Sequence, residues 1–293
     1  MNGIFRHLRR LSTNSFVVAE EVREAVKSGS AVVALESTVI THGLPYPENI
    51  RAAQSLEQVV RQEGAVPATI ALLNGRVHVG LSNTELEQIA AAKDAVKVSR
   101  RDLPIALAKG RLGGTTVAAT MFLAHRAGIS TFATGGIGGV HRGAEQTFDI
   151  SADLIELGRT PVTVVCAGVK SILDVRKTLE YLETQSVPVV VFGDSNIFPG
   201  FFSATSDCKA PFSTSSIDDL VDICEHSASL GLSAAPLIAC PIPQQHAAAG
   251  MEIEEAIQKA LREANAAGIR SQDVTPYLLR RVNELTQGKS LIA

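Results

Sequence analysis

The residues with the clearest chemical potential are two ionisable side chains that directly follow apolar runs. Glu36 ends the run 31–35, and Lys170 ends the run 161–169. Burial penalises the charged form of either group, which favours a protonated carboxyl that acts as a general acid and an uncharged amine that acts as a nucleophile. The alternatives are a carboxylate that caps backbone amides and a lysine that reaches outward to solvent.

Two further segments are suited to an anionic substrate. Residues 97–102 combine Lys97 with Arg100 and Arg101, a cluster that fits a phosphate monoester, although solvated charge runs are common. Residues 113–116 (GGTT) precede a helical stretch and predict either an anion site or a plain N-cap. Walker A and G-x-G-x-x-G patterns are missing from the sequence, which disfavours nucleoside triphosphates and dinucleotides.

A glycine-rich loop and two aspartates follow. Residues 135–143 (GGIGGVHRG) could approach a ligand closely, and His141 is a candidate substrate contact, although a surface loop would have a similar composition. Asp149 and Asp153 lie four residues apart, on one face of a predicted helix. Carboxylates select Mg²⁺ or Mn²⁺, but an N-cap and a favourable charge near the helix start are the alternatives.

Alternating strands and helices must position these segments. Strands are predicted at residues 31–35, 68–73, 77–79, 131–133, 162–165, 187–192 and 236–239, and helices at 47–63, 84–92, 115–127, 150–157, 174–184, 217–230 and 251–267. Continuous apolar strands that alternate with helices predict an α/β fold, a single-domain, three-layer αβα sandwich around a mostly parallel or mixed sheet. Ligands bind such sheets at the carboxyl ends of the strands. Residues 193–216 form a long excursion, interpreted as a lid, a surface loop or a disordered segment.

Composition narrows the function classes for this chain of 293 residues. The formal charge of −3, the absence of Trp and an aromatic content of 4% argue against nucleic-acid binding. Apolar runs are too short to cross a membrane. The four cysteines form no C-x-x-C pair, which argues against a structural zinc site and favours a reducing compartment.

The amino terminus has the composition of a targeting segment. Residues 1–16 contain Arg6, Arg9 and Arg10, and no acidic residue precedes Glu20. We expect a cleaved mitochondrial-type leader followed by a catalytic domain at 17–293. The alternative is a basic tail on a cytoplasmic protein.

Long ordered blocks of sequence carry a family resemblance. They are residues 34–38 (ALEST), 41–43 (THG), 64–70 (GAVPATI), 97–102 (KVSRRD), 134–143 (TGGIGGVHRG), 148–153 (FDISAD) and 166–171 (CAGVKS). From about Val17 to Leu291 the chain resembles the pseudouridine-5′-phosphate glycosidases, the indigoidine synthase A-like family. The resemblance implies reversible cleavage of pseudouridine 5′-phosphate by water into uracil and D-ribose 5-phosphate.

The resemblance also implies roles for individual residues. Lys170 corresponds to a nucleophile that forms an imine, and Glu36 to the proton donor for ribose ring opening. Asp149 corresponds to a ligand of Mn²⁺, with Mg²⁺ as the alternative ion. The implied substrate-binding positions are Lys97, Val117, His141, Ser151, Ala152 and Asp153. A homotrimer, and a functional link to a pseudouridine kinase that is not part of this chain, are further implications.

Three features depart from the family pattern. The pattern continues beyond Gly288 into a closing helix with an active-site asparagine, which we expect this chain to lack. Cys240 stands where an asparagine is usual, and the excursion at 193–216 differs. The rival hypotheses are a catalytically impaired sugar-phosphate-binding subunit or truncated isoform, and another Schiff-base enzyme such as a sugar-phosphate aldolase.

Overall fold

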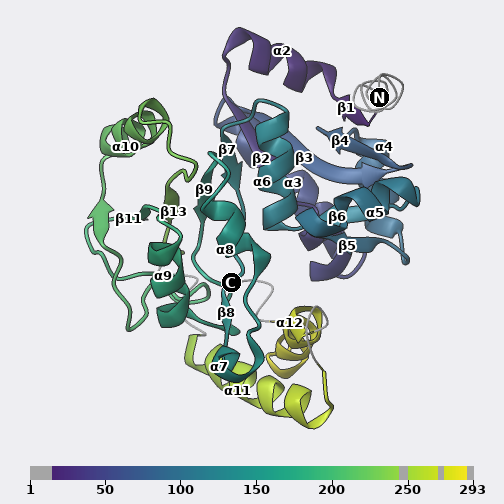
Figure 1. Cartoon of the computed structure of the whole chain (residues 1–293). Coiled ribbons are helices and arrows are strands. Elements are labelled where there is room, and N and C mark those ends of the chain that lie inside the picture. The colour runs from purple at the N-terminus through teal and green to yellow at the C-terminus, as the bar shows by residue number, and fades with distance from the viewer. Residues whose placement is uncertain (1–14, 244–249, 270–273, 289–293) are drawn as a thin grey trace, which may run out of the picture. The chain divides into compact units, whose positions relative to one another are not determined.

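The computed structural model describes residues 15–243, 250–269 and 274–288, and the chain divides into two compact units at residues 133 and 134 (Figure 1). The strands of the first unit are β1 (Phe16–Val18), β2 (Val32–Leu35), β3 (Val66–Leu73), β4 (Arg76–Val79), β5 (Val96–Val98), β6 (Gly113–Thr115) and β7 (Thr131–Ala133). The pairs β2–β3, β2–β7, β1–β4 and β5–β6 are parallel, whereas β3 runs antiparallel to β4 and β6. The sheet of this unit is therefore mixed.

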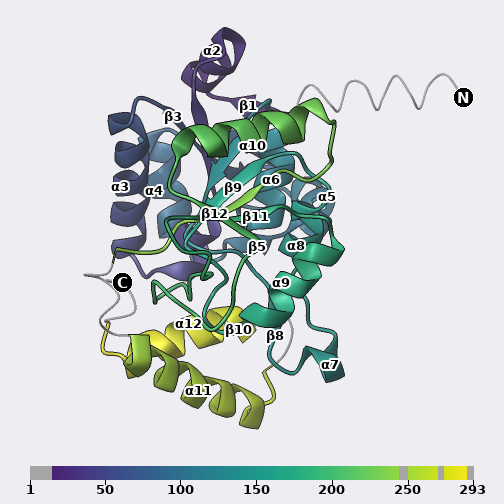
Figure 2. The same ribbon diagram turned by 90° about the vertical axis from the view of Figure 1, so that its left-hand side faces the viewer.

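The helices of the first unit lie on both sides of its strands (Figure 2). They are α2 (Glu20–Ser28), the π-helix η1 (Val39–Gly43), α3 (Glu48–Gln62), α4 (Asn83–Ala91), the 3₁₀-helix η2 (Arg100–Asp102), α5 (Leu103–Ala108) and α6 (Val117–Arg126). Ala71 and Leu73, on one face of β3, belong to the same hydrophobic cluster as Ile50 of α3 and Ile89 of α4. Burial of seven of the eight residues of β3 explains its continuous apolar sequence.

The second unit contains the parallel strands β9 (Thr163–Cys166), β13 (Leu237–Ala239), β11 (Val189–Phe192) and β12 (Phe212–Thr214), paired in that order. A short antiparallel pair joins β8 (Val140–His141) to β10 (Leu173–Asp174). The helices are α7 (Ala144–Thr147), α8 (Ala152–Leu157), α9 (Val175–Thr184), α10 (Ile217–Ser229), α11 (Gly250–Ala266) and α12 (Val274–Leu285). Helices α11 and α12 pack against each other.

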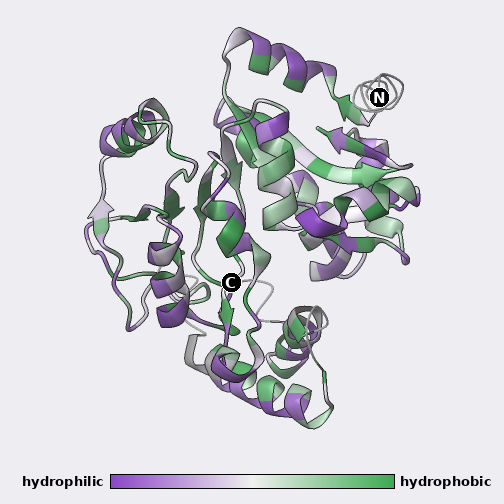
Figure 3. Ribbon diagram, in the orientation of Figure 1, coloured by the Kyte–Doolittle hydropathy of each residue, from purple (hydrophilic) through white to green (hydrophobic). Residues whose placement is uncertain are grey.

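The predicted α/β class is confirmed, with a mostly parallel mixed sheet flanked by helices. All seven predicted strands and all seven predicted helices are present, within two residues of the expected ends. Hydrophobic residues concentrate on the strands of the first unit, whereas α2 is largely hydrophilic (Figure 3). In the part of the chain that the structure describes, no helix has the length and apolarity to span a bilayer.

Two expectations need revision. The interpretation of residues 193–216 as a disordered segment is wrong, because this excursion supplies β12, pairs Ile197 with Lys209, and buries Phe198 and Cys208. Residues 113–115 form β6 rather than an open anion-binding loop, and the Thr116 hydroxyl accepts a hydrogen bond from the peptide N–H of Ala119. The N-cap alternative for the GGTT segment is the one observed.

The predicted leader falls mainly on residues 1–14, outside the described residues. The peptide carbonyl of Ser15 accepts a hydrogen bond from Val77, and β1 begins at Phe16. A leader that ends before Ser15 would leave β1 intact.

Candidate functional site

Glu36 lies where β2 ends and the π-helix η1 is about to begin. The Thr38 hydroxyl donates to its carboxylate. A π-helical turn is uncommon and is frequently found at functional sites. The local backbone therefore places a carboxyl group at the carboxyl end of a buried parallel strand, as the sequence predicts.

The partner of β3 changes next to Glu36. On one edge, β3 pairs with β2 as far as Thr69 and with β6 from Ala71 onward. Between these pairings, the Ile70 carbonyl accepts hydrogen bonds from Ser37 Oγ at 2.6 Å and Thr115 Oγ1 at 2.7 Å. Ser37 and Thr115 are fully buried, and a buried backbone carbonyl needs a hydrogen-bond partner. The two hydroxyls therefore take the place of a strand partner for the Ile70 carbonyl.

The same hydroxyl cluster connects Glu36 to the start of α6. Thr115 N–H donates to Ser37 Oγ at 2.9 Å, and Thr115 Oγ1 lies 2.9 Å from Thr120 Oγ1. Val117, the first residue of α6, follows Thr115 by two positions. Glu36 directly precedes Ser37, and Val117 follows Thr115 by two positions, so both residues adjoin the same hydrogen-bonded cluster.

Lys97 approaches this framework through β5. Its Cα pairs with that of Gly114 on β6. A side chain at Gly114 is excluded, because a Cβ there would lie 2.2 Å from Thr41 Oγ1 and 2.8 Å from the Ser37 carbonyl. Burial, together with the charge of Lys97, lowers the pKa of His42 on η1. The structure thus adds His42, which is absent from the predicted site residues.

In the second unit, the glycine-rich loop runs beside the segment that carries Lys170. The Ile137 N–H donates to the Gly168 carbonyl, and the Lys170 N–H donates to the Ile137 carbonyl, both at 3.1 Å. Gly136 fits against Phe201 of the excursion, since a Cβ there would lie 2.4 Å from the Phe201 ring. The loop therefore fixes the backbone of Lys170.

Asp153 and Ser151 support the loop from the other side. The Gly138 N–H donates to Asp153 Oδ2 at 2.9 Å, and the Ser151 N–H donates to the Gly139 carbonyl at 3.0 Å. Asp153 is 6% exposed, whereas the neighbouring Ala152 is exposed. The Asp153 carboxylate thus accepts a hydrogen bond from a backbone amide of the loop. A carboxylate that served only as a favourable charge near the start of a helix would not need this contact.

His141 and Asp149 lie opposite each other. The His141 N–H donates to the Asp149 carbonyl at 3.0 Å, and the ring Nδ1 lies 3.9 Å from Asp149 Oδ2. The predicted N-cap alternative for Asp149 is wrong, because Ser151 caps α8. The Asp149 side chain is 33% exposed and accessible to a ligand.

The donor set around Asp149 suits only one kind of metal ion. Within residues 15–243, 250–269 and 274–288, no three His, Cys, Asp or Glu side chains form a group that could hold a metal. One accessible carboxylate fits a hard, largely hydrated cation such as Mg²⁺ or Mn²⁺. It does not fit tetrahedral zinc.

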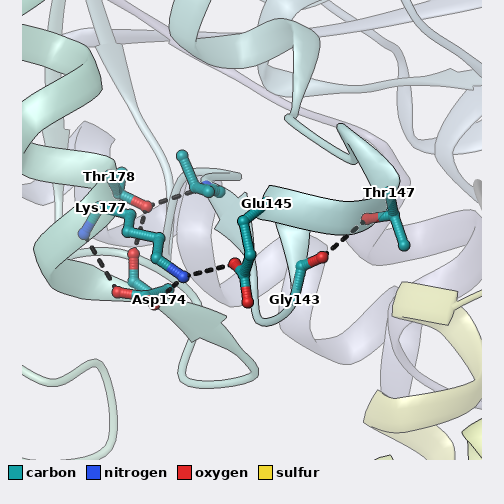
Figure 4. A network of polar contacts seen from close by, with 7 residues as sticks. Gly143, Glu145, Thr147, Asp174, Lys177 and Thr178 are labelled. Carbon is teal, nitrogen blue, oxygen red and sulfur yellow. Dashed lines mark hydrogen bonds and ion pairs between the residues drawn. The ribbon is translucent and has the colours of Figure 1, made fainter.

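A polar network anchors the segment between His141 and Asp149 (Figure 4). Lys177 Nζ lies 2.7 Å from Glu145 of α7 and 3.3 Å from Asp174. The buried Thr178 hydroxyl accepts the Val140 N–H at 2.9 Å and donates to the Asp174 carbonyl at 2.6 Å. Thr178 is a site-supporting residue that sequence reasoning missed, although its place on the buried stripe of α9 with Leu182 was a signal.

The cysteines are all free. Burial raises the pKa of the Cys166 thiol to about 12 and also raises that of Cys240. The Cys240 N–H donates to the Cys166 carbonyl at 2.7 Å. At Cys240, the position where the family has an asparagine, the backbone therefore continues the β9–β13 pairing by one residue.

Comparison with known proteins gives concordant matches over most of the chain. The family model described as "Indigoidine synthase A like protein" matches residues 21–293. The pseudouridine-5′-phosphate glycosidase 2 of Rhizobium johnstonii is 53% identical over 94% of this chain and 89% of that protein. The pseudouridine-5′-phosphate glycosidase of Arabidopsis thaliana is 48% identical over 100% of this chain and 90% of that protein.

Two solved structures have the same fold. The prealnumycin C-glycosynthase AlnA, solved in complex with ribulose 5-phosphate, has a TM-score of 0.86 and 38% identity, covering 95% of this chain and 90% of that one. An indigoidine synthase A-like protein of Thermotoga maritima has a TM-score of 0.84 and 36% identity, covering 94% and 89%.

Proposed function

Because this chain belongs to the indigoidine synthase A-like family, we propose that it cleaves pseudouridine 5′-phosphate with water, reversibly, into uracil and D-ribose 5-phosphate. The observation that carries the proposal is the placement of Lys170. Its backbone is held by the glycine-rich loop, which the buried Asp153 carboxylate supports and which leads to His141. Pseudouridine-5′-phosphate glycosidases with about 50% identity to this chain strengthen the assignment.

The proposed mechanism uses Glu36 and Lys170 in sequence. Glu36 gives a proton to the ring oxygen of the ribose as the bond from this oxygen to the anomeric carbon breaks, and the Lys170 amine bonds to that carbon. The nitrogen then gives up a proton, and the electron pair that this frees forms the imine while the carbon–carbon bond breaks. The electron pair of the broken bond goes to uracil C5, which takes up a proton in place of the one that the nitrogen gave up. Water hydrolyses the imine and releases ribose 5-phosphate. A nucleophilic amine suits this bond, because carbon is a poor leaving atom.

Substrate binding is proposed for Lys97, Val117, His141, Ser151, Ala152 and Asp153. Asp149 would hold a hydrated Mn²⁺, with Mg²⁺ as the alternative, and a divalent ion supplies charge stabilisation near an anionic substrate. The accessible carboxylate of Asp149 supports this role. Treatment with a chelator is expected to abolish turnover, and added Mn²⁺ is expected to restore it. In Asp149→Ala, the Mn²⁺ requirement measured by activity should rise at least tenfold.

Two measurements test the function. The first is formation of pseudouridine 5′-phosphate from uracil and ribose 5-phosphate in the presence of Mn²⁺. The second is borohydride trapping with ribose 5-phosphate, followed by peptide mass mapping, which should find the sugar on Lys170. Lys170→Arg is the matched control, because it keeps the charge but cannot form the imine.

The outcomes separate the competing functions. Binding of ribose 5-phosphate without trapping or turnover would indicate a catalytically impaired binding subunit. Trapping on Lys170 followed by turnover that does not require uracil would indicate an aldolase. Trapping on a different lysine would overturn the proposed role of Lys170.

The same proposal includes the protein's context. The assembly would be a homotrimer, and a pseudouridine kinase would supply the phosphorylated substrate. The basic segment at residues 1–16 would direct import into mitochondria, with the cytoplasm as the alternative location. Light scattering of the purified protein tests the trimer, and a fluorescent fusion of residues 1–16 tests the location.

A further inference from the structure

His42 lies beside Lys97 without belonging to the proposed catalytic set. It is on η1, where the ring Nδ1 is 2.7 Å from the hydroxyl oxygen of Thr41. The Thr41 hydroxyl also packs against Gly114, the Cα partner of Lys97. The strand register and this packing contact therefore bring the backbone of Lys97 close to η1, and the positive charge of Lys97 acts on the His42 ring.

The hydrogen bonds around Thr41 bear on which nitrogen of the His42 ring carries the hydrogen. Thr41 Oγ1 is 3.3 Å from the Ser37 carbonyl, but that carbonyl already accepts the N–H groups of Ile40 and Thr41, both at 3.1 Å. The Thr41 hydroxyl is thus within hydrogen-bond distance of two acceptors, and Nδ1 of His42 at 2.7 Å is the closer one. A neutral imidazole that accepts at Nδ1 carries its hydrogen on Nε2.

The electrostatic surroundings agree with a neutral ring. Burial is the main cause of the lowered pKa of His42, and the positive charge of Lys97 adds to it. At neutral pH the ring is thus uncharged.

The Nε2–H group is accessible. The bond to Thr41 is the one hydrogen bond of the His42 ring among the described residues. Every fully buried side-chain nitrogen or oxygen in that part of the chain has a partner. The Nε2 atom is therefore in contact with solvent, where a ligand can reach it.

A neutral N–H donor next to an ammonium group suits an anion with several acceptor oxygens. We propose that His42 Nε2 donates a hydrogen bond to the phosphate group of the bound sugar phosphate, alongside Lys97, and that Thr41 is a positioning residue that fixes the required tautomer. The inference deepens the proposed function, on which it rests for the identity of the sugar.

The test compares affinities for ribose 5-phosphate, measured by isothermal titration calorimetry, in two pairs of variants. His42→Leu removes the donor and should weaken binding at least tenfold, whereas His42→Gln keeps a side-chain N–H and should stay within about threefold of the parent protein. Thr41→Val should weaken binding several-fold, whereas Thr41→Ser keeps the hydroxyl and should not. Circular dichroism and melting temperature show whether each variant is folded.

A second readout ties the effect to the phosphate. Ribose and inorganic phosphate serve as competitors of ribose 5-phosphate, and His42→Leu should weaken competition by phosphate but leave competition by ribose unchanged. Equal affinity of folded His42→Leu and parent protein for ribose 5-phosphate, or equal weakening for ribose, would overturn the inference, as would a parent protein that does not bind ribose 5-phosphate. A parent protein that binds ribose 5-phosphate in a His42-dependent manner but forms no pseudouridine 5′-phosphate would overturn the proposed function alone.

Discussion

The carboxylate of Asp153 accepts a hydrogen bond from the backbone N–H of Gly138 over 2.9 Å, and both residues are buried. This bond fastens the middle of the glycine-rich loop to the start of α8. Two residues before Asp153, Ser151 meets the same loop at Gly139. The start of α8 therefore holds two successive residues of the loop that fixes Lys170, one through its N–H and the other through its carbonyl.

Removal of the Asp153 carboxylate should loosen this loop. In Asp153→Ala the buried Gly138 N–H loses its acceptor, which costs about 1–3 kcal/mol of unfolding free energy. Asp153→Asn keeps an acceptor oxygen and should lose less. Urea denaturation and kcat/KM for pseudouridine 5′-phosphate measure the two effects. Equal stability of the Ala and Asn variants would contradict the assigned contact.

The loop glycines should differ in their tolerance of a methyl group. A Cβ at Gly138 would lie 2.2 Å from Ser151 Oγ and 2.6 Å from Asp153 Oδ2, whereas a Cβ at Gly135 meets nothing within 4 Å. Gly138→Ala should therefore cost about 1–3 kcal/mol through overpacking and reduce turnover strongly. Gly135→Ala is the matched control, and comparable losses in both variants would show that general loop stiffness, rather than contact, is responsible.

The Thr178 hydroxyl should matter more than its methyl group. Thr178→Val leaves the Val140 N–H and the Asp174 carbonyl without this partner, and we expect a loss of about 1–3 kcal/mol and a fall in kcat. Thr178→Ser keeps both hydrogen bonds and should recover most of the activity. The comparison uses thermal denaturation together with separate values of kcat and KM. A serine variant as impaired as the valine variant would argue against the positioning role.

Acid should destabilise the protein partly through His42. Its pKa is lower in the folded than in the unfolded chain, so the unfolded chain binds more protons between these two values. The stability contribution is complete above the unfolded value of about 6.5 and is lost as pH falls through the folded value. The uncharged His42→Gln should flatten this part of the stability curve, measured by urea denaturation from pH 7.5 to 5. A parallel curve for the variant would exclude His42 as a source.

Cys166 should resist alkylation in the folded protein. A thiol with a pKa of about 12 is ionised in on the order of one molecule in 10,000 at pH 8, and this thiol is also buried. Iodoacetamide should modify the partly exposed Cys224 first, and mass spectrometry identifies the order. Modification of Cys166 at a rate similar to that of Cys224 would contradict this environment.

The sequence predicts best what depends on continuous apolar runs. β9 and the residues after it could be placed because a buried parallel strand leaves a long hydrophobic signature that ends near Lys170. β6 could not, because two of its three residues are glycines and have no side-chain pattern. Gly114 is required there by Thr41, a residue distant in sequence. The roles of His42 and Thr178 depend on similar long-range contacts, which spacing along the chain does not reveal.

The change of partner along β3 has a consequence for how this site can vary. β6 is held in register by Thr115, and β5 is held by β6, so the separation between Glu36 and Lys97 is set by strand pairing. A register changes only in whole residues, each about 3.3 Å, and a one-residue slip turns every side chain of the strand to the opposite face. The distance between the proton donor and the cation therefore has discrete allowed values, and gradual repacking of the core cannot adjust it to a larger or smaller substrate.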